Sequence, residues 1–536
     1  MSPQLSKMIL AFLLLFPAFS LYLKILWPYL AQTGFEGAII VACEIVFILF
    51  ISVFNTHPKI SRDAILLISA IACWHLLGLI SAIISDHFHA SLIKQIEYAI
   101  HCIFAYSVWI FLSQIRKTEK MTYFLIFTLL WVIYYILAAW HSNSDAFQYD
   151  WVHGTPMFNN IRHLGFFQIG ILPLLFFPLL SERRHKHVIT LVLLSVFWAS
   201  VIWSSSRGTF LGAIIISILL ALFFSRQRKT ILLASLITLL IGWLIALQFP
   251  SESPSLNPYR LLFLNFGDTG NLTSNQLSSG RTTLWLTTLS HMWQHSALFG
   301  FAADGYQYVD PHIWPDTVQP HSGPVQLLSE FGILGFSCLL YIMFICIKLW
   351  HRHPGSINNK LARFSLLAIA IGSLIDGHFY HTFSLLLICF LLALSFSEPK
   401  ETIHSKSSKT KAFAILLVVS LFIWPIQQHW QTYIVQQFSL TDKSQLEQVK
   451  KFPSYYFPMS WLYGHSNVLE LRHESIKLGQ KNGPRRCNYY LMEYLDSQDK
   501  RQKTRLLNSL KETCTKSELN RSKDNILMAL SSEAKR

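Results

Sequence analysis

Long apolar runs, separated by short polar or basic segments, dominate the pattern along this chain. Two clear examples, "MILAFLLLFPAFSLYLKILW" and "LLASLITLLIGWLIALQF", have the length of roughly 18 or more residues that marks a membrane-spanning helix. Runs of this kind predict spans at about 5–27, 37–54, 64–84, 92–113, 121–140, 164–181, 187–204, 208–225, 230–249, 324–350, 361–376, 381–398 and 411–430. We therefore expect an all-α polytopic membrane protein with roughly 12–13 transmembrane helices.

The first apolar run could be mistaken for a secretory signal, because it follows Lys7. It contains no small-x-small cleavage site, and further spans follow it, so we interpret it as a retained first span. Composition supports the membrane assignment, because 52% of the residues are hydrophobic and only 14% are charged. Soluble domains carry about 25% charged residues.

The positive charges predict the orientation. Alternate loops, together with Lys7, hold about twenty Lys and Arg residues, whereas the other loops up to residue 430 hold about six. The basic set is Lys59/Arg62, Arg116/Lys117/Lys120, Arg183/Arg184/Lys186, Arg226/Arg228/Lys229, Lys348/Arg352/Lys360/Arg363 and Lys400/Lys406/Lys409/Lys411. Because basic loops stay cytoplasmic, we expect a cytoplasmic N-terminus and a C-terminal tail on the outer side.

The predicted spans and orientation divide the chain into four segments. They are an N-terminal transmembrane bundle (1–249), an outer loop with an amphipathic helix (250–323), C-terminal transmembrane helices (324–430) and a small helical outer domain (431–536). The tail is basic, but nucleic acid is excluded as a partner because the tail faces the wrong compartment. Cys487 and Cys514 lie in this tail, and spacing alone leaves open whether they form a disulfide.

Two arginines on the predicted outer face are candidates for binding an anion. Arg207 lies in "SSSRGTFLG", where two spans meet with almost no loop, and charges at that depth usually have a function or a partner. Arg281 opens "GRTTLWLTTLSHMWQHSALFG", in which Leu284, Trp285, Thr288, Leu289, Met292 and Trp293 have helical spacing. We expect an interfacial amphipathic helix with Arg281 at its N-terminal end. The alternative for both arginines is contact with lipid headgroups.

His321 lies between two prolines in "PHSGP", directly before an apolar run. Gly323 and Pro324 suit the N-cap and first helical position of the next span. His321 would then lie just outside a helix N-terminus, whose dipole favours the neutral imidazole that a general base needs. The alternative is a hydrogen-bonded interfacial histidine.

Further polar residues occupy the same face. Arg162 and His163 precede the sixth span, and Asp376 ends another span, with His378 and Tyr380 as weaker candidates after it. Arg162 and His163 are either ligands or interfacial anchors, and Asp376 either orients a partner or is a solvated helix end.

Several familiar chemistries are excluded. The chain has no Walker loop, no HExxH and no clustered His/Cys ligands, so we expect neither nucleotide hydrolysis nor a metal. Convergent guanidinium groups suit a diphosphate, which they bind in bidentate fashion.

Four segments in order resemble the motifs of the O-antigen ligase and O-oligosaccharyltransferase superfamily. They are "SSSRGTFLG", "GRTTLWLTTLSHMWQHSALFGFAADGY", "PHSGPVQLLSEFGILGF" and "SLIDGHFYHTFSL", and the resemblance covers roughly residues 150–395. "FNNIRHLGFF" resembles a motif of the protein-glycosylating branch, which includes pilin-specific enzymes. The family often has His-Asn where this chain has His321-Ser322, which puts any role of a neighbouring amide in doubt.

The resemblance implies transfer of a glycan from an undecaprenyl-diphosphate carrier to an acceptor hydroxyl in the periplasm, without metal or other cofactor. It implies that His321 is the base, that Arg207 and Arg281 bind the diphosphate, and that Arg162 and Asp376 support binding. A protein Ser or Thr is the favoured acceptor, with lipid A-core ligation and chain polymerisation as alternatives. A lipid-linked glycan transporter or flippase and a non-catalytic scaffold are the readings from other classes, and no internal repeat supports a transporter.

Overall fold

A computed structural model of the chain describes most of the predicted spans. The described residues are 33–54, 57–58, 62–113, 161–180, 187–204, 206–248, 281–308, 319–375, 381–397, 402–403, 423–427 and 500–513, with a few isolated residues between 377 and 499. The spans predicted at 5–27 and 121–140, and most of that at 411–430, lie outside this set.

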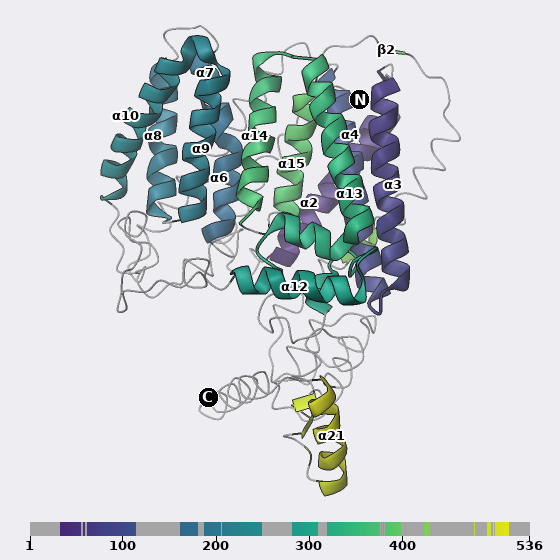
Figure 1. Ribbon diagram of the computed structural model, residues 1–536. Coiled ribbons are helices and arrows are strands. Elements are labelled where there is room, and N and C mark those ends of the chain that lie inside the picture. The colour runs from purple at the N-terminus through teal and green to yellow at the C-terminus, as the bar shows by residue number, and fades with distance from the viewer. Residues whose placement is uncertain are drawn as a thin grey trace. The chain divides into compact units, whose positions relative to one another are not determined.

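Helices make up nearly all of the described structure (Figure 1). They are α2 (Thr33–Phe54), α3 (Arg62–Ile84), α4 (Phe88–Ser113), α6 (Ile161–Leu175), α7 (Phe177–Leu180), α8 (His187–Trp203), α9 (Arg207–Phe223), α10 (Arg228–Ala246), α12 (Arg281–His295), α13 (Gly323–Arg352), α14 (Ile357–Ser373), α15 (Thr382–Ser395) and α21 (Lys500–Thr513). Short 3-10 turns cover Ser225–Gln227 and Gly305–Tyr308, and two two-residue strands, β1 (His57–Pro58) and β2 (Thr402–Ile403), pair antiparallel.

The prediction of an all-α polytopic membrane protein is confirmed. In the described part of the chain, four helices are long and apolar enough to cross a membrane, and five shorter apolar helices accompany them. Helix ends fall within a few residues of the predicted spans, because hydropathy changes sharply where the chain leaves the membrane. Pro173 lies inside α6 and α7 begins four residues later, as expected for a proline-kinked span.

Contacts group the chain into two compact units, each built from separated segments. The first comprises residues 1–69, 97–272 and 341–426, and the second comprises residues 70–96, 273–340 and 427–536. In the first unit, α8 packs on α10, α6 packs on α14 and α9, and α15 packs on α14 and α2 (Figure 1). The predicted division at residues 249, 323 and 430 is not tested by this grouping and stays a prediction.

Small residues bring the helices of the first unit close together. A Cβ added at Gly242 of α10 would meet the backbone of α8 at Ala199, 2.8 Å away. A Cβ added at Gly170 of α6 would meet Ile369 of α14 at 2.9 Å. Such close approach is the usual basis of helix association in lipid, where burial of apolar surface gives no driving force.

Contacts between helix ends agree with the alternation of the predicted loops. Arg352 donates to Asp63 at 2.7 Å, and β1 pairs with β2. All four of these segments belong to loops that the positive charges place on one side of the membrane. At the opposite end of the bundle, Gly208 lies against Ile375, and both belong to predicted outer loops. The described contacts therefore support the predicted alternation, while the identity of the cytoplasmic side stays a prediction.

The tail contains the helix α21, in which Leu506 and Leu510 are buried. Gln502 donates to Glu493 at 2.9 Å, and the Lys503 ammonium lies 5.6 Å from the centroid of the Tyr494 ring. Cys487, Cys514 and most of the predicted outer domain lie outside the described residues, so the disulfide and the extent of that domain stay predictions.

Candidate active site

Arg207 is the first residue of α9, at the end of a tight turn from α8. Ser206 takes the N-cap position with extended backbone, and its hydroxyl pairs with that of Thr209 at 2.9 Å. Arg207 is exposed, and no described residue forms a hydrogen bond or ion pair with its guanidinium. A cation at a helix N-terminus that has no partner among the described residues is available to an anionic ligand.

Arg281 opens α12, as the sequence predicts. The helix buries Leu284, Thr288 and Met292, three members of the predicted face. Trp293 was expected on the same face but is 66% exposed, because it lies around the helix from that buried stripe. This exposed apolar side suits lipid contact, and an interfacial location for α12 stays a prediction.

Trp285 connects α12 to the segment that carries His321. Its indole N–H donates to the carbonyl of Pro320 at 2.8 Å. Arg281 lies one helical turn before Trp285 on the same helix. The second unit therefore brings the start of α12 and the Pro320–His321 segment together.

His321 has a backbone conformation that is uncommon for residues other than glycine. Its φ is +51°, in the left-handed region that most L-residues avoid. Such strain persists where surrounding structure enforces it, and it is concentrated at functional sites. His321 is half-buried between the buried residues Pro320 and Ser322.

The start of α13 differs by one residue from the expected start. The helix begins at Gly323, and Gln326 N–H donates to the carbonyl of Ser322 at 2.8 Å, so Ser322 takes the N-cap position instead of Gly323. Ser and Asn are both favoured N-cap residues. The Ser that stands where the family often has Asn is therefore a residue type that suits this N-cap position.

α13 is broken at Gly332, which has φ +62° and ψ −171°. This combination is accessible essentially only to glycine. The break separates a short segment of α13, headed by Ser322, from the long segment that continues to Arg352. The segment 296–301 satisfies the freed backbone groups. Phe301 N–H donates to Ser329 O at 2.8 Å, and Ile333 and Leu334 N–H donate to the carbonyls of Ala297 and Leu298 at 2.9 and 3.2 Å.

A buried carboxylate lies at this break. Glu330 is 1% exposed, accepts from Gln326 Nε2 at 3.3 Å, and lies near Asp304 and Lys94. Asp304 and Ala302 also have positive φ, so the segment that holds the break is itself strained. Glu330 is not among the site residues predicted from the sequence. One feature of the sequence could have indicated it, because Glu330 is an acidic residue in the otherwise apolar run "VQLLSEFGILGF".

The remaining candidates are not tested. The structure describes the backbone of Arg162 and His163, which lie at the start of α6, but not their side chains. Asp376, His378 and Tyr380 lie outside the described residues.

Arg207 belongs to the first unit, whereas Arg281 and His321 belong to the second. Within the described part of the chain, no group of three or more His, Cys, Asp or Glu residues could hold a metal ion.

Residues 164–340 match the family model described as O-antigen ligase. This part of the chain is similar to O-antigen ligases. This confirms the superfamily resemblance drawn from the motifs. The O-antigen ligase match includes Arg207, Arg281, His321 and the break at Gly332, and it implies an activity of the lipid-linked glycan ligase or polymerase type. No curated protein matches the chain.

Proposed function

We propose that this protein transfers an oligosaccharide from undecaprenyl diphosphate to a Ser or Thr hydroxyl of an acceptor protein, with pilin as the favoured class. The protein would lie in the bacterial cytoplasmic membrane, with its active face and tail in the periplasm. The positive-charge distribution supports that orientation, and "FNNIRHLGFF" supports a protein acceptor.

In the proposed reaction, His321 takes the proton of the acceptor hydroxyl. The oxygen attacks the anomeric carbon, a new carbon–oxygen bond forms, and the bond to the phosphate oxygen breaks. Arg207 and Arg281 stabilise the negative charge on the departing lipid diphosphate. Arg162, His163, Asp376 and His378 contribute to substrate binding. One displacement inverts the anomeric configuration, and the leaving group is already activated, so no metal or other cofactor is needed.

The observation that carries this proposal is the strained His321 at the head of a broken helix, inside the O-antigen ligase match. Pro320, whose carbonyl accepts from the Trp285 indole, and the start of α13 flank this histidine and restrict its backbone. A restricted backbone supports a role as base, because a base must lie within hydrogen-bond reach of the hydroxyl.

A second candidate is ligation to the lipid A core. The description of the matching family, O-antigen ligase, favours it. The proposed chemistry is the same, and only the acceptor differs. Comparing periplasmic glycopeptides and lipopolysaccharide, with and without the gene, separates the two acceptors. A vanished glycopeptide supports protein glycosylation, whereas a loss confined to lipopolysaccharide replaces it with core ligation.

His321→Asn is the sharpest test of the base. Asn tolerates positive φ but cannot take the proton, so the variant should fold and transfer should fall about 10²- to 10⁴-fold. His351→Asn, an exposed histidine at the other end of α13, is the control and should retain full transfer.

Transfer is measured with purified lipid-linked donor and an acceptor peptide, and donor in the outer leaflet is measured separately. Full turnover by His321→Asn would contradict the proposal. Loss of outer-leaflet donor with this variant would point to a transporter instead.

A further inference from the structure

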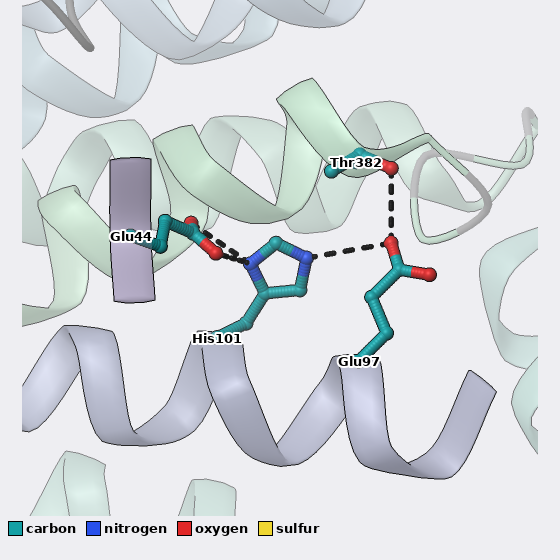
Figure 2. Close-up of polar contacts among 4 residues, drawn as sticks. All are labelled: Glu44, Glu97, His101 and Thr382. Atoms are coloured by element: carbon teal, nitrogen blue, oxygen red, sulfur yellow. Dashed lines mark hydrogen bonds and ion pairs between the residues drawn. The ribbon is translucent and has the colours of Figure 1, made fainter. Parts of the chain in front are cut away.

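A polar cluster of four residues lies inside the first unit (Figure 2). His101 of α4 has carboxylates at both ring nitrogens. Glu44 of α2 lies 2.9 Å from Nδ1, and Glu97, one turn earlier on α4, lies 3.6 Å from Nε2. The hydroxyl of Thr382 donates to Glu97 at 2.9 Å. We call these four residues the Glu97 network.

The network is fully inside the protein and at membrane depth. Glu44, His101 and Glu97 are 0%, 2% and 3% exposed, and Glu44 and His101 lie near the midpoints of α2 and α4. Ionisable groups at such depth are costly and usually mark a functional site. All four residues lie outside the matched range 164–340, so the family match assigns them no role.

The fourth member shows where the network acts. Thr382 is the first residue of α15, and His381 is its N-cap without a side-chain capping bond. The Thr382 hydroxyl is bonded to the Glu97 carboxylate, and a negative charge near a helix N-terminus is favourable. His101 lies between Glu97 and Glu44, 3.6 and 2.9 Å from their carboxylates, and so links α4 to α2. The start of α15 is thus fixed by a chain of contacts that crosses three helices.

We propose that Glu97 and Thr382 are positioning residues for glycan transfer, because they fix the start of α15 and the chain that leads into it at His381. This inference rests on the proposed function, since "DGHFYH" immediately precedes Thr382 and contains the substrate-binding candidates Asp376 and His378. In this proposal, the Glu97 network does not contact substrate. It fixes the position at which the chain enters α15.

The test uses Thr382, because removing Glu44 or His101 leaves an unpaired buried charge and can prevent folding. Thr382→Val removes the hydroxyl and keeps the shape, and Thr382→Ser restores the hydroxyl. The control is Thr238→Val in α10, a buried threonine that donates only to carbonyls of its own helix, at 2.6 and 3.2 Å.

We expect Thr382→Val to raise the KM for lipid-linked donor or lower kcat, with at least a 10-fold loss of kcat/KM per folded molecule. Thr382→Ser should recover most of that loss, and Thr238→Val should match the unmodified protein. A purely structural role predicts instead that both valine variants lower the folded amount while kcat/KM per folded molecule stays constant, which would overturn the proposal.

A second readout is independent of turnover. Phe379→Cys adds a thiol three residues before Thr382, and its maleimide labelling is followed by mass spectrometry of that peptide. Labelling should be faster with Thr382→Val than with Thr382→Ser or Thr238→Val. If the unmodified protein transfers no glycan, the proposed function fails while this rate still tests the network. Equal rates in all backgrounds would refute positioning even where transfer is intact.

Discussion

At the scale of single residues, two arginines of this protein have opposite surroundings. Arg363 of α14 donates to the carbonyls of Trp350, His353, Pro354 and Ser395 at 2.7–3.3 Å. It thereby satisfies the C-terminal ends of α13 and α15. Arg207 has no such partner among the described residues. The sequence indicated Arg207 as a candidate because of its predicted depth in the membrane. Arg363 was predicted only as one of the basic residues of the cytoplasmic loops.

Replacing each of these arginines by methionine should separate structure from binding. Arg363→Met removes the hydrogen bonds to the part-buried carbonyls of Trp350 and Ser395, so we expect a loss of stability on the order of 1–2 kcal/mol, with transfer per folded molecule retained. Arg207→Met should keep the melting temperature and raise the KM for the lipid-linked donor at least 10-fold. Thermal unfolding in detergent and donor titration measure the two effects. An Arg207→Met protein that melts early and binds donor normally would contradict this assignment.

At the scale of elements, the sequence predicted where most described helices lie but not how α13 is built. Hydrophobic runs end where the chain meets water, and that change is visible residue by residue. The break at Gly332 lies inside the continuous run "EFGILGF", and its backbone groups are satisfied by residues 297–301, about thirty positions earlier. Periodicity within a segment cannot show a partner that distant. For the same reason, the sequence could not show the hydrogen bond from the Trp285 indole N–H to the Pro320 carbonyl.

Glycine substitutions test the break directly. A Cβ at Gly332 would meet the backbone of Leu298 and Gly300, atoms that cannot move aside easily, and the φ of +62° disfavours any other residue. We expect Gly332→Ala to cost about 2–4 kcal/mol and to lower transfer, because the segment headed by His321 loses its anchor. The melting temperature and the transfer rate report the two effects.

Gly212→Ala in α9 is the matched control, since its Cβ would meet only the end of the Ile169 side chain. That side chain can turn away, so the change should be nearly neutral. If both alanine variants are nearly neutral for the melting temperature and the transfer rate, the break at Gly332 is not needed for stability or for transfer.

At the scale of the whole molecule, the alternation of loops was predictable because charge and hydropathy are local properties. The pairing of helices was not, since it depends on close approaches such as that of Gly242 to Ala199. Of the candidate site, the sequence supplied the residue types and the order of the motifs. It did not supply the strain at His321, the carboxylate Glu330 or the Glu97 network, because these depend on segments that meet only after folding.

Sidedness gives the last prediction. Asp63 and Arg352 form an ion pair at 2.7 Å, so both must lie on one side of the membrane, and the basic loops place that side in the cytoplasm. In spheroplasts, cysteines at Asp63→Cys and Arg352→Cys should resist a membrane-impermeant maleimide until the membrane is opened. Arg505→Cys in α21 should label at once, because the thirteen spans predicted from the sequence would place the tail on the outer side. Labelling of Asp63→Cys and Arg352→Cys on opposite sides would contradict the fold itself. A complete reversal of all three would keep the fold, and it would move His321 to the cytoplasmic face, where no periplasmic acceptor could reach it.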